Sequence, residues 1–266
     1  MILRDINNTY KMKLINAIIL STVLLVSLSL FNLHQMMITM NPVIRVIENQ
    51  ILLYRIRDYK ALETENFIIK YDYIEKEQLQ LVAETAEDKY QALKKFFGFE
   101  PKKKIVLVVH KDSNRMMSTT MLRKGAPPMG VYYANSVHIL EPSQLFGNNT
   151  EELFYSEGPV LHEIAHLFTD LASKGNYPMW FTEGVSLYLE YSVDGYVWGQ
   201  GEAIDAEEYS IENLTKSFSQ LNQHLAYTQS FRLVKGFVDK YGEEELIKLI
   251  NILGEGKNLR NYYHLF

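Results

Sequence analysis

The sequence predicts an α+β fold, with a small mixed β-sheet in the N-terminal part and a helical C-terminal part. Before residue 140, short runs rich in β-branched and aromatic residues favour strands. After residue 150, apolar residues recur at helical spacing between glycine and proline breakers. An uncharged apolar run at residues 14–33 adds one expected transmembrane helix ahead of the domain.

The composition fits one globular domain with a short extension and argues against some functions. The chain has 266 residues, 47% of them hydrophobic, so it can bury a full core. Its net charge of −5, without a basic stripe, argues against a nucleic-acid-binding surface. It has no cysteine, which excludes disulfides and thiolate metal ligands but leaves the cellular compartment open.

The first 60 residues are predicted to form a membrane anchor followed by a stem. Residues 1–13 are basic on balance, and the apolar run at residues 14–33 is long enough to cross a hydrocarbon layer of about 30 Å. The basic flank predicts a cytoplasmic N-terminus and a domain outside the cytoplasm at the cell membrane. A cleaved signal peptide ending near Ser27 and Ser29, or a buried core helix, fits the run less well. Residues 34–60 are expected to form a helical stem, or else an amphipathic helix on the membrane surface.

The remaining residues, 61–266, are expected to form the domain. Strands are predicted at residues 65–72, 104–110 and 131–140, the last with room for two. Apolar residues at steps of three and four predict helices at residues 77–97, 179–192, 211–221, 225–241 and 243–253, and a short helix at residues 117–122. Residues 197–208 are predicted to be a loop. Its acidic side chains either favour basic substrates or simply face the solvent.

The stretch between the two parts contains the motif H-E-x-x-H at His162, Glu163 and His166. In a helix the two histidines lie one turn apart on one face, so both imidazoles can reach a single metal ion. On its own, so short a motif also occurs by chance on ordinary amphipathic helices. A second feature is therefore needed to support a metal site.

Glu183 is the candidate for a third metal ligand. A catalytic zinc ion takes three protein ligands and a water, and the motif supplies only two. Glu183 lies downstream in the segment W-F-T-E-G, and Gly175 and Pro178 interrupt the helix between the two motifs. Two helices joined by a turn can therefore bring Glu183 to the open side of the histidine pair, with Trp180 and Phe181 as anchors.

Together, the two motifs resemble those of the gluzincin zinc metallopeptidases, specifically the bacterial peptidase MA-like domain related to thermolysin and the M1 aminopeptidases. The resemblance covers about residues 66–253 and is strongest over residues 161–190. It implies a helix that binds Zn²⁺ between the sheet and the helical part. The implied ligands are His162, His166 and Glu183, and the implied general base is Glu163.

The resemblance implies roles for further residues. Tyr227, in a segment similar to the helix that ends the peptidase MA-like core, could donate a hydrogen bond to the oxyanion; His224 is a weaker candidate, and core packing is the alternative. Asp170, one turn after His166, is expected to be structural rather than a partner of a histidine. The strand before the zinc helix either binds extended substrate through the segment from Tyr132 to Asn135 or is a plain edge strand.

The function implied is that of a membrane-anchored zinc metallopeptidase acting on peptide or protein substrates. Gly130-Val-Tyr-Tyr-Ala carries no glutamate that could hold a free amine, which favours an endopeptidase. The alternatives are a membrane-tethered peptide-binding or scaffold protein with a non-catalytic zinc, and hydrolysis of a non-peptide amide. The oligomeric state is left open.

Overall fold

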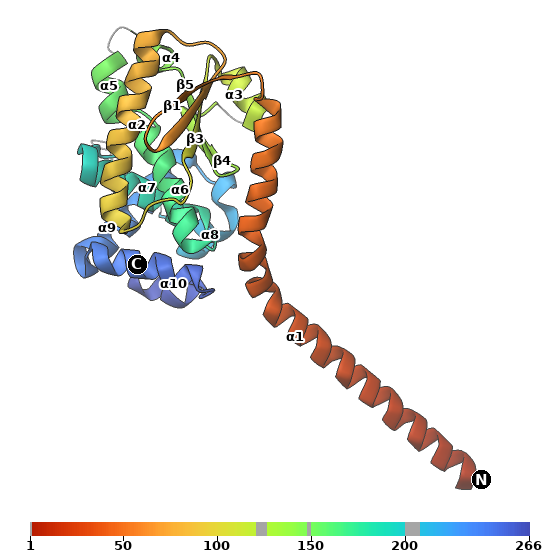
Figure 1. Ribbon diagram of the computed structural model, residues 1–266. Helices are drawn as coiled ribbons and strands as arrows, with labels where there is room; N and C mark the ends of the chain where they lie inside the picture. Colours follow the sequence, from red (N-terminus) through yellow and green to blue (C-terminus); the bar gives the residue numbers. More distant parts are fainter. Residues whose placement is uncertain (1, 121–126, 148–149, 200–207) are drawn as a thin grey trace.

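The computed structural model describes residues 2–120, 127–147, 150–199 and 208–266. A long helix projects from a domain in which a five-stranded sheet packs against several helices (Figure 1). This arrangement agrees with the predicted α+β class. The expected loop at residues 197–208 and the end of the helix expected at residues 117–122 lie partly outside the described residues.

The sheet is mixed, with the strand order β1-β2-β3-β5-β4. Strands β2, β3 and β5 are parallel, and β1 and β4 are antiparallel edge strands. The bounds are β1 (Lys60–Glu63), β2 (Phe67–Tyr71), β3 (Ile105–His110), β4 (Gly130–Tyr133) and β5 (Ser136–Leu140). Strand β1 was not predicted, because Lys-Ala-Leu-Glu has no β-branched or aromatic residue, and its pairing with β2 overrides this weak local preference.

Several helices of the domain follow the predicted ranges, but the helices at Pro142–Phe146 and Thr150–Glu157 were not predicted. Gly98 and Gly195 end α2 and α7 in the left-handed conformation, as expected for helix C-caps. The bounds are α2 (Lys76–Phe97), α3 (Ser113–Thr120), α4 (Pro142–Phe146), α5 (Thr150–Glu157), α6 (Val160–Ser173), α7 (Met179–Asp194), α8 (Ile211–Ser217), α9 (Gln223–Tyr241) and α10 (Glu243–Gly254). The 3₁₀ segments η2 (Phe218–Gln220) and η3 (Leu259–Leu265) follow α8 and α10.

The two faces of the sheet are covered by different helices. Successive side chains of a strand point to opposite faces. On β3, Leu107 and Val109 belong to the main core, which includes side chains of α2 and α6. Val108 belongs to a second cluster with Leu52 and Ile56 of the N-terminal helix. The N-terminal helix is therefore part of the packed domain at its C-terminal end.

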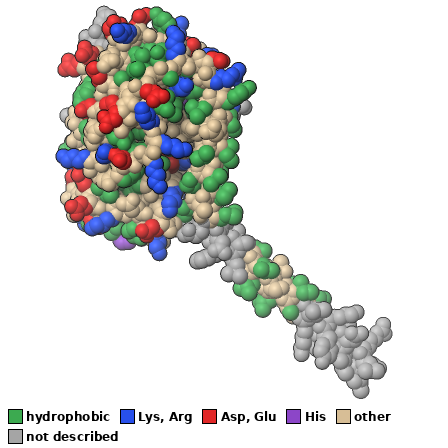
Figure 2. Space-filling view, in the orientation of Figure 1, with side chains coloured by type: hydrophobic (Ala, Val, Ile, Leu, Met, Phe, Trp, Pro, Cys, Tyr) green, Lys and Arg blue, Asp and Glu red, His purple; other side chains and the backbone are tan. Residues whose placement is uncertain are grey.

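The N-terminal helix α1 (Ile2–Arg55) is continuous and runs through Pro42. We expected an anchor and a separate stem, and the structure joins them into one helix. Exposed hydrophobic side chains cover residues 15–26 where α1 projects, whereas charges of both signs are spread over the domain (Figure 2). Among the described residues, no helix is sufficiently long and apolar to span a membrane, so the transmembrane helix predicted at residues 14–33 is not supported.

Candidate metal centre

Helix α6 carries the H-E-x-x-H motif and is buried along most of its length. Ile164, Ala165 and Phe168 pack into the main core, which leaves the two histidines on a face toward α7. The helix ends in a turn where Lys174 and Gly175 both have positive φ, 55° and 73°. This is the break that the sequence predicted between the two motifs.

Helix α7 returns from that turn and brings Glu183 to the histidines. Trp180 and Phe181 are fully buried in the core and fix the start of α7. Gly184 allows a close approach to α9, because a Cβ atom added there would lie 2.4 Å from the carbonyl oxygen of Ser230. Packing on both sides of Glu183 therefore restricts where its carboxylate can lie.

The three predicted ligands converge. Nε2 of His162 lies 3.1 Å from Oε2 of Glu183, and Nε2 of His166 lies 3.4 Å from the same oxygen. One donor atom from each residue lies within 4.8 Å of the others. Ligands of a tetrahedral zinc ion, at about 2.0–2.1 Å from the metal, are about 3.3–3.5 Å apart. The donor set and its spacing therefore fit a zinc ion.

The other nitrogen of each imidazole has its own partner. Nδ1 of His162 lies 3.3 Å from Oε2 of Glu190, and Nδ1 of His166 lies 2.7 Å from Oγ1 of Thr182. Histidines that bind metals commonly donate their second ring N–H in this way, which fixes the tautomer. Both contacts leave Nε2 available for a metal. The sequence analysis missed these partners, although Glu190 is two helical turns after Glu183 and so lies on the same face of α7.

The site attracts positive charge. Burial opposes a charge on His162, but the carboxylates of Glu190, Glu183 and Glu163 outweigh it and raise the pKa of His162 well above its ordinary value. Burial would likewise raise the pKa of Glu183, but His166 and His162 hold it well below the ordinary range. A divalent cation would balance this cluster of carboxylates.

Glu163, the predicted base, lies between the ligands and the edge of the sheet. Burial raises the pKa of Glu163. The two histidines partly offset this rise, and the charge of Glu183 adds to it. The nearby backbone N–H of Tyr132 on β4 also acts to lower this pKa. A Cβ atom at Gly130 would lie 2.8 Å from Cγ of Glu163, so only glycine fits this close contact. Strand β4 thus lies directly against Glu163.

Strand β4 is shorter than the segment proposed for substrate binding. Tyr132 and Tyr133 belong to the strand, but Ala134 and Asn135 form the tight turn to β5, with φ angles of 52° and 56°. Two residues with positive φ are typical of a type I′ hairpin turn. The prediction that all four line an extended edge strand is therefore wrong for Ala134 and Asn135.

Tyr227 on α9 lies near the ligands and also packs against aromatic rings. Burial raises the pKa of Tyr227, and the nearby carboxylates of Glu183 and Glu163 add to the rise. Its ring lies 5.7 Å from that of Trp198 and 5.6 Å from that of Phe218, centroid to centroid. The ring of His224 lies 5.6 Å from that of Trp198, centroid to centroid. Tyr227 thus lies near the predicted ligands and also takes part in aromatic packing.

Asp170 is buried one turn after His166. It pairs with Nη2 of Arg45 at 2.6 Å and accepts hydrogen bonds from the hydroxyls of Tyr132 and Tyr177, each at 2.9 Å. Burial raises the pKa of Asp170, and these partners partly offset the rise. These contacts agree with the structural role expected from the sequence.

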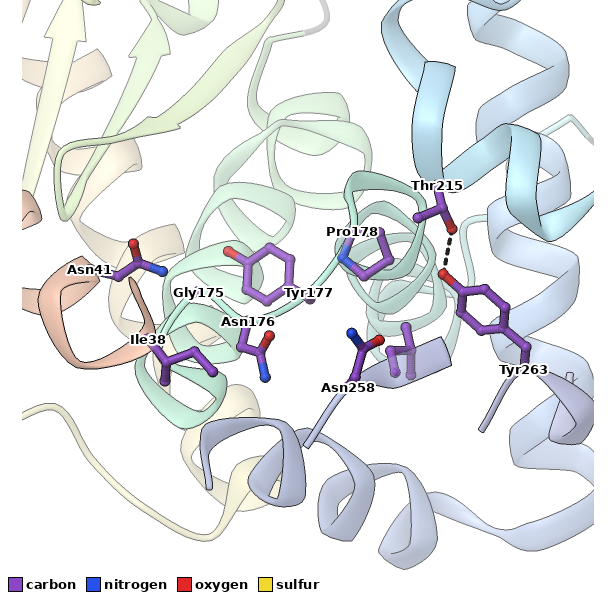
Figure 3. Close-up of a pocket in the computed structure, with 10 residues that line it drawn as sticks. Ile38, Asn41, Gly175, Asn176, Tyr177, Pro178, Thr215, Asn258 and Tyr263 are labelled. Atoms are coloured by element: carbon purple, nitrogen blue, oxygen red, sulfur yellow. Dashed lines mark hydrogen bonds between the residues drawn. The ribbon is translucent and has the colours of Figure 1, made fainter. Parts of the chain in front are cut away.

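A cavity of about 230 Å³ lies between α1 and the turn that joins α6 to α7 (Figure 3). It is lined by Ile38 and Asn41 of α1, by the turn from Gly175 to Pro178, and by Asn258, Leu259 and Tyr263 near the C-terminus. None of the predicted metal ligands lines it. We therefore do not assign the substrate site to this cavity.

Comparison with known proteins agrees with this geometry. A search of curated proteins gives no match. A model of the peptidase MA superfamily matches residues 85–264, which include all of α6, α7 and α9. The match covers more than half of the chain, so the chain belongs to the peptidase MA superfamily.

Proposed function

We propose that this protein is a zinc metallopeptidase that hydrolyses peptide bonds. The main support is the convergence of His162, His166 and Glu183, with the carboxylate of Glu163 beside them. Membership of the superfamily adds support, because its peptidases are generally zinc-dependent.

Each residue of the proposed site has its own part in the reaction. Bound Zn²⁺ would lower the pKa of a water molecule and polarise the carbonyl of the scissile bond. Glu163 takes a proton from the attacking water and delivers it to the leaving amine, a task that suits a carboxylate with a raised pKa. The hydroxyl of Tyr227 donates to the oxyanion that develops on the carbonyl. Glu190 and Thr182 keep the histidine rings oriented.

The proposed substrate is an extended peptide that pairs with the edge of the sheet. Strand β4 is an edge strand, and its contact with Glu163 would bring a paired peptide close to the base. The strand has no carboxylate to hold a free α-amino group. We therefore favour cleavage within a chain over removal of N-terminal residues.

The test compares zinc-loaded wild type with Glu163→Gln on a peptide library, with cleavage sites mapped by mass spectrometry. We expect internal cleavage by wild type and a loss of about 10²–10⁴-fold in kcat for Glu163→Gln, because the variant cannot accept the proton. The zinc content should be unchanged, since Glu163 is not a ligand. Cleavage by the variant at the wild-type rate would contradict the assigned base.

The same experiment separates the alternative function. A peptide-binding or scaffold protein would retain peptides with equal affinity in wild type and in Glu163→Gln, and neither protein would turn them over. Folded, zinc-loaded wild type that binds peptides without cleaving them would therefore replace the peptidase proposal.

Location at the cell membrane, with the domain outside the cytoplasm, stays a prediction from the basic and apolar N-terminal sequence. Alkaline extraction of membranes from cells that produce the full chain tests it. Retention in the membrane fraction would support the prediction, and complete release would contradict it.

A further inference from the structure

The part of helix α1 that packs on the domain presents an uncharged face to the outside. Eight large hydrophobic side chains in this part are 45–68% exposed: Met36, Met40, Val43, Ile44, Val46, Ile47, Ile51 and Tyr54. The other exposed side chains described between them, Thr39, Pro42 and Gln50, carry no charge. We call these eleven residues the outer face of α1. Figure 2 shows hydrophobic side chains along the edge of the domain that α1 occupies in Figure 1.

The charges of this stretch lie on the side of the domain. Arg45 and Glu48 are the only charged residues in the sequence of residues 36–54. Nη2 of Arg45 lies 2.6 Å from Oδ1 of Asp170, which is buried, and Glu48 is half-buried. The helix is therefore amphipathic in an unusual sense, because its polar side holds the protein and its apolar side is turned outward.

The outer face is too wide for the seam of a two-stranded coiled coil. At about 100° per residue, its eleven residues cover roughly 200° of the circumference of the helix. A coiled-coil seam takes two of every seven positions, and charged residues commonly flank it. Pro42 and Ile44, at the two margins of the outer face, carry no charge. A second copy of α1 would therefore cover only part of this surface.

The outer face continues an apolar surface and ends at basic residues. Toward the N-terminus, exposed hydrophobic side chains cover residues 15–26 of the same helix. Beyond Tyr54, the side chains of Arg55 and Arg57 are exposed, with the acid Asp58 next to them. The guanidinium carbon of Arg57 lies 4.5 Å from the centroid of the Tyr54 ring. Tyrosine and arginine at the end of an apolar surface match the boundary between the hydrocarbon and the phosphate groups of a bilayer.

We propose that the outer face of α1 lies against a phospholipid bilayer while the opposite side of the helix holds the domain. The stem and the surface helix, which the sequence left as alternatives for residues 34–60, are then two faces of one helix. From residue 15 to residue 54, α1 is about 60 Å long, twice the roughly 30 Å of hydrocarbon in a bilayer. A continuous helix of this length lies oblique to the membrane or along it, and it binds through its apolar area.

This contact would place the proposed substrate edge close to the lipid. On the inner side of α1, Nδ2 of Asn49 donates to the carbonyl oxygen of Ala134, in the turn after β4, at 2.7 Å. Nη1 of Arg45 donates to the hydroxyl of Tyr132 on β4 at 3.4 Å. A helix with its side chains is about 10 Å across, so this end of β4 would lie about one helix diameter from the membrane. In so far as it rests on the proposed function, this position favours substrates at the membrane surface.

The test uses the full chain in vesicles of phosphatidylcholine and phosphatidylglycerol. Because the chain has no cysteine, a single introduced cysteine can carry an environment-sensitive fluorophore without background labelling. Ile47→Cys reports on the outer face. Lys95→Cys is the control, because Lys95 is exposed on α2, which covers the other face of the sheet. Each label is quenched separately by a nitroxide on the lipid acyl chains and by iodide in the water.

The label at residue 47 should have blue-shifted emission and be quenched by the nitroxide lipid rather than by iodide. The label at residue 95 should show the opposite. Quenching by iodide at residue 47 to the same extent as at residue 95 would overturn the proposal. Protection of residue 47 from both quenchers would also overturn it, because protein, such as a second copy of the chain, would then cover the outer face.

A second comparison tests whether the apolar character of the face causes the contact. With the fluorophore on Val43→Cys, the added change Ile47→Glu, one turn away, should reduce quenching by the nitroxide lipid, because a charge in hydrocarbon is costly. Lys95→Glu should leave the quenching unchanged. Equal quenching with and without Ile47→Glu would contradict the contact. None of these measurements needs turnover, so wild type that cleaves no peptide would overturn the proposed peptidase and leave this test valid.

Discussion

At the scale of single residues, the position of one proton on each imidazole decides whether α6 can bind a metal. His162 and His166 must both carry that proton on Nδ1. Glu190 accepts it from His162, and the hydroxyl oxygen of Thr182 accepts it from His166.

Tyr227 provides a test at this scale. If its hydroxyl donates to the oxyanion, Tyr227→Phe should lower kcat by about 10²–10³-fold, the range observed when a comparable donor is removed. KM and zinc content should change little, because the phenyl ring keeps the contacts with Trp198 and Phe218. Steady-state kinetics on one peptide decides the point. An unchanged kcat would leave Tyr227 with a packing role only.

Spacing along the chain predicted some of these residues and could not predict others. The ligand set follows from H-E-x-x-H and W-F-T-E-G because each motif lies on one helix, where sequence spacing fixes the geometry. The contact of Arg45 with Tyr132 joins residues 87 positions apart. No local pattern encodes such a contact, because it depends on how α1 packs against the finished sheet.

At the scale of elements, the contact between α7 and α9 fixes the third ligand. Gly184→Ala should lower stability by about 1–3 kcal/mol and weaken zinc binding, because the new methyl group meets the backbone of Ser230 and must displace α7 beside Glu183. Gly236→Ala on α9 is a matched control, since a Cβ atom there meets nothing within 4 Å. The control should be neutral or stabilising by up to about 1 kcal/mol. Thermal unfolding and zinc titration of both variants would show the difference; equal behaviour would contradict the proposed close packing.

The elements that sequence predicted well are those with a complete local signal. Helices α2 and α7 have apolar periodicity and a glycine at the C-cap, and β3 has an unbroken apolar run. Strand β1 and the continuous α1 lack such signals. Helix α1 runs through Pro42, although proline lacks an amide hydrogen, and packs on the sheet beyond it.

At the scale of the whole molecule, α1 covers a sheet face that contains a buried histidine pair. Nε2 of His110 lies 2.9 Å from Nδ1 of His138, and both side chains are completely buried. Burial lowers the pKa of His110 to about 4 and holds that of His138 well below its ordinary value. The folded domain therefore keeps both rings neutral at pH 7.

This pair predicts a loss of stability in mild acid. The pKa values in the folded state lie below the unfolded value of about 6.5, so protonation favours unfolding. Stability should fall as the pH drops from about 6.5 toward about 4, by roughly 2 kcal/mol at pH 5 from His110 alone. His110→Leu should lose less stability than wild type over the same range, measured by denaturant unfolding at pH 7.5 and pH 5. Equal losses in the two proteins would contradict the assignment.

The most direct test of the central claim is the zinc content of the folded full chain, wild type beside Glu183→Ala, after equilibration with zinc and removal of the excess. The account predicts about one zinc ion per wild-type chain and weaker retention in Glu183→Ala, because the variant keeps only the two histidines of α6 as ligands. Folded wild-type protein that retains no zinc would contradict the three-ligand site and the peptidase mechanism built on it.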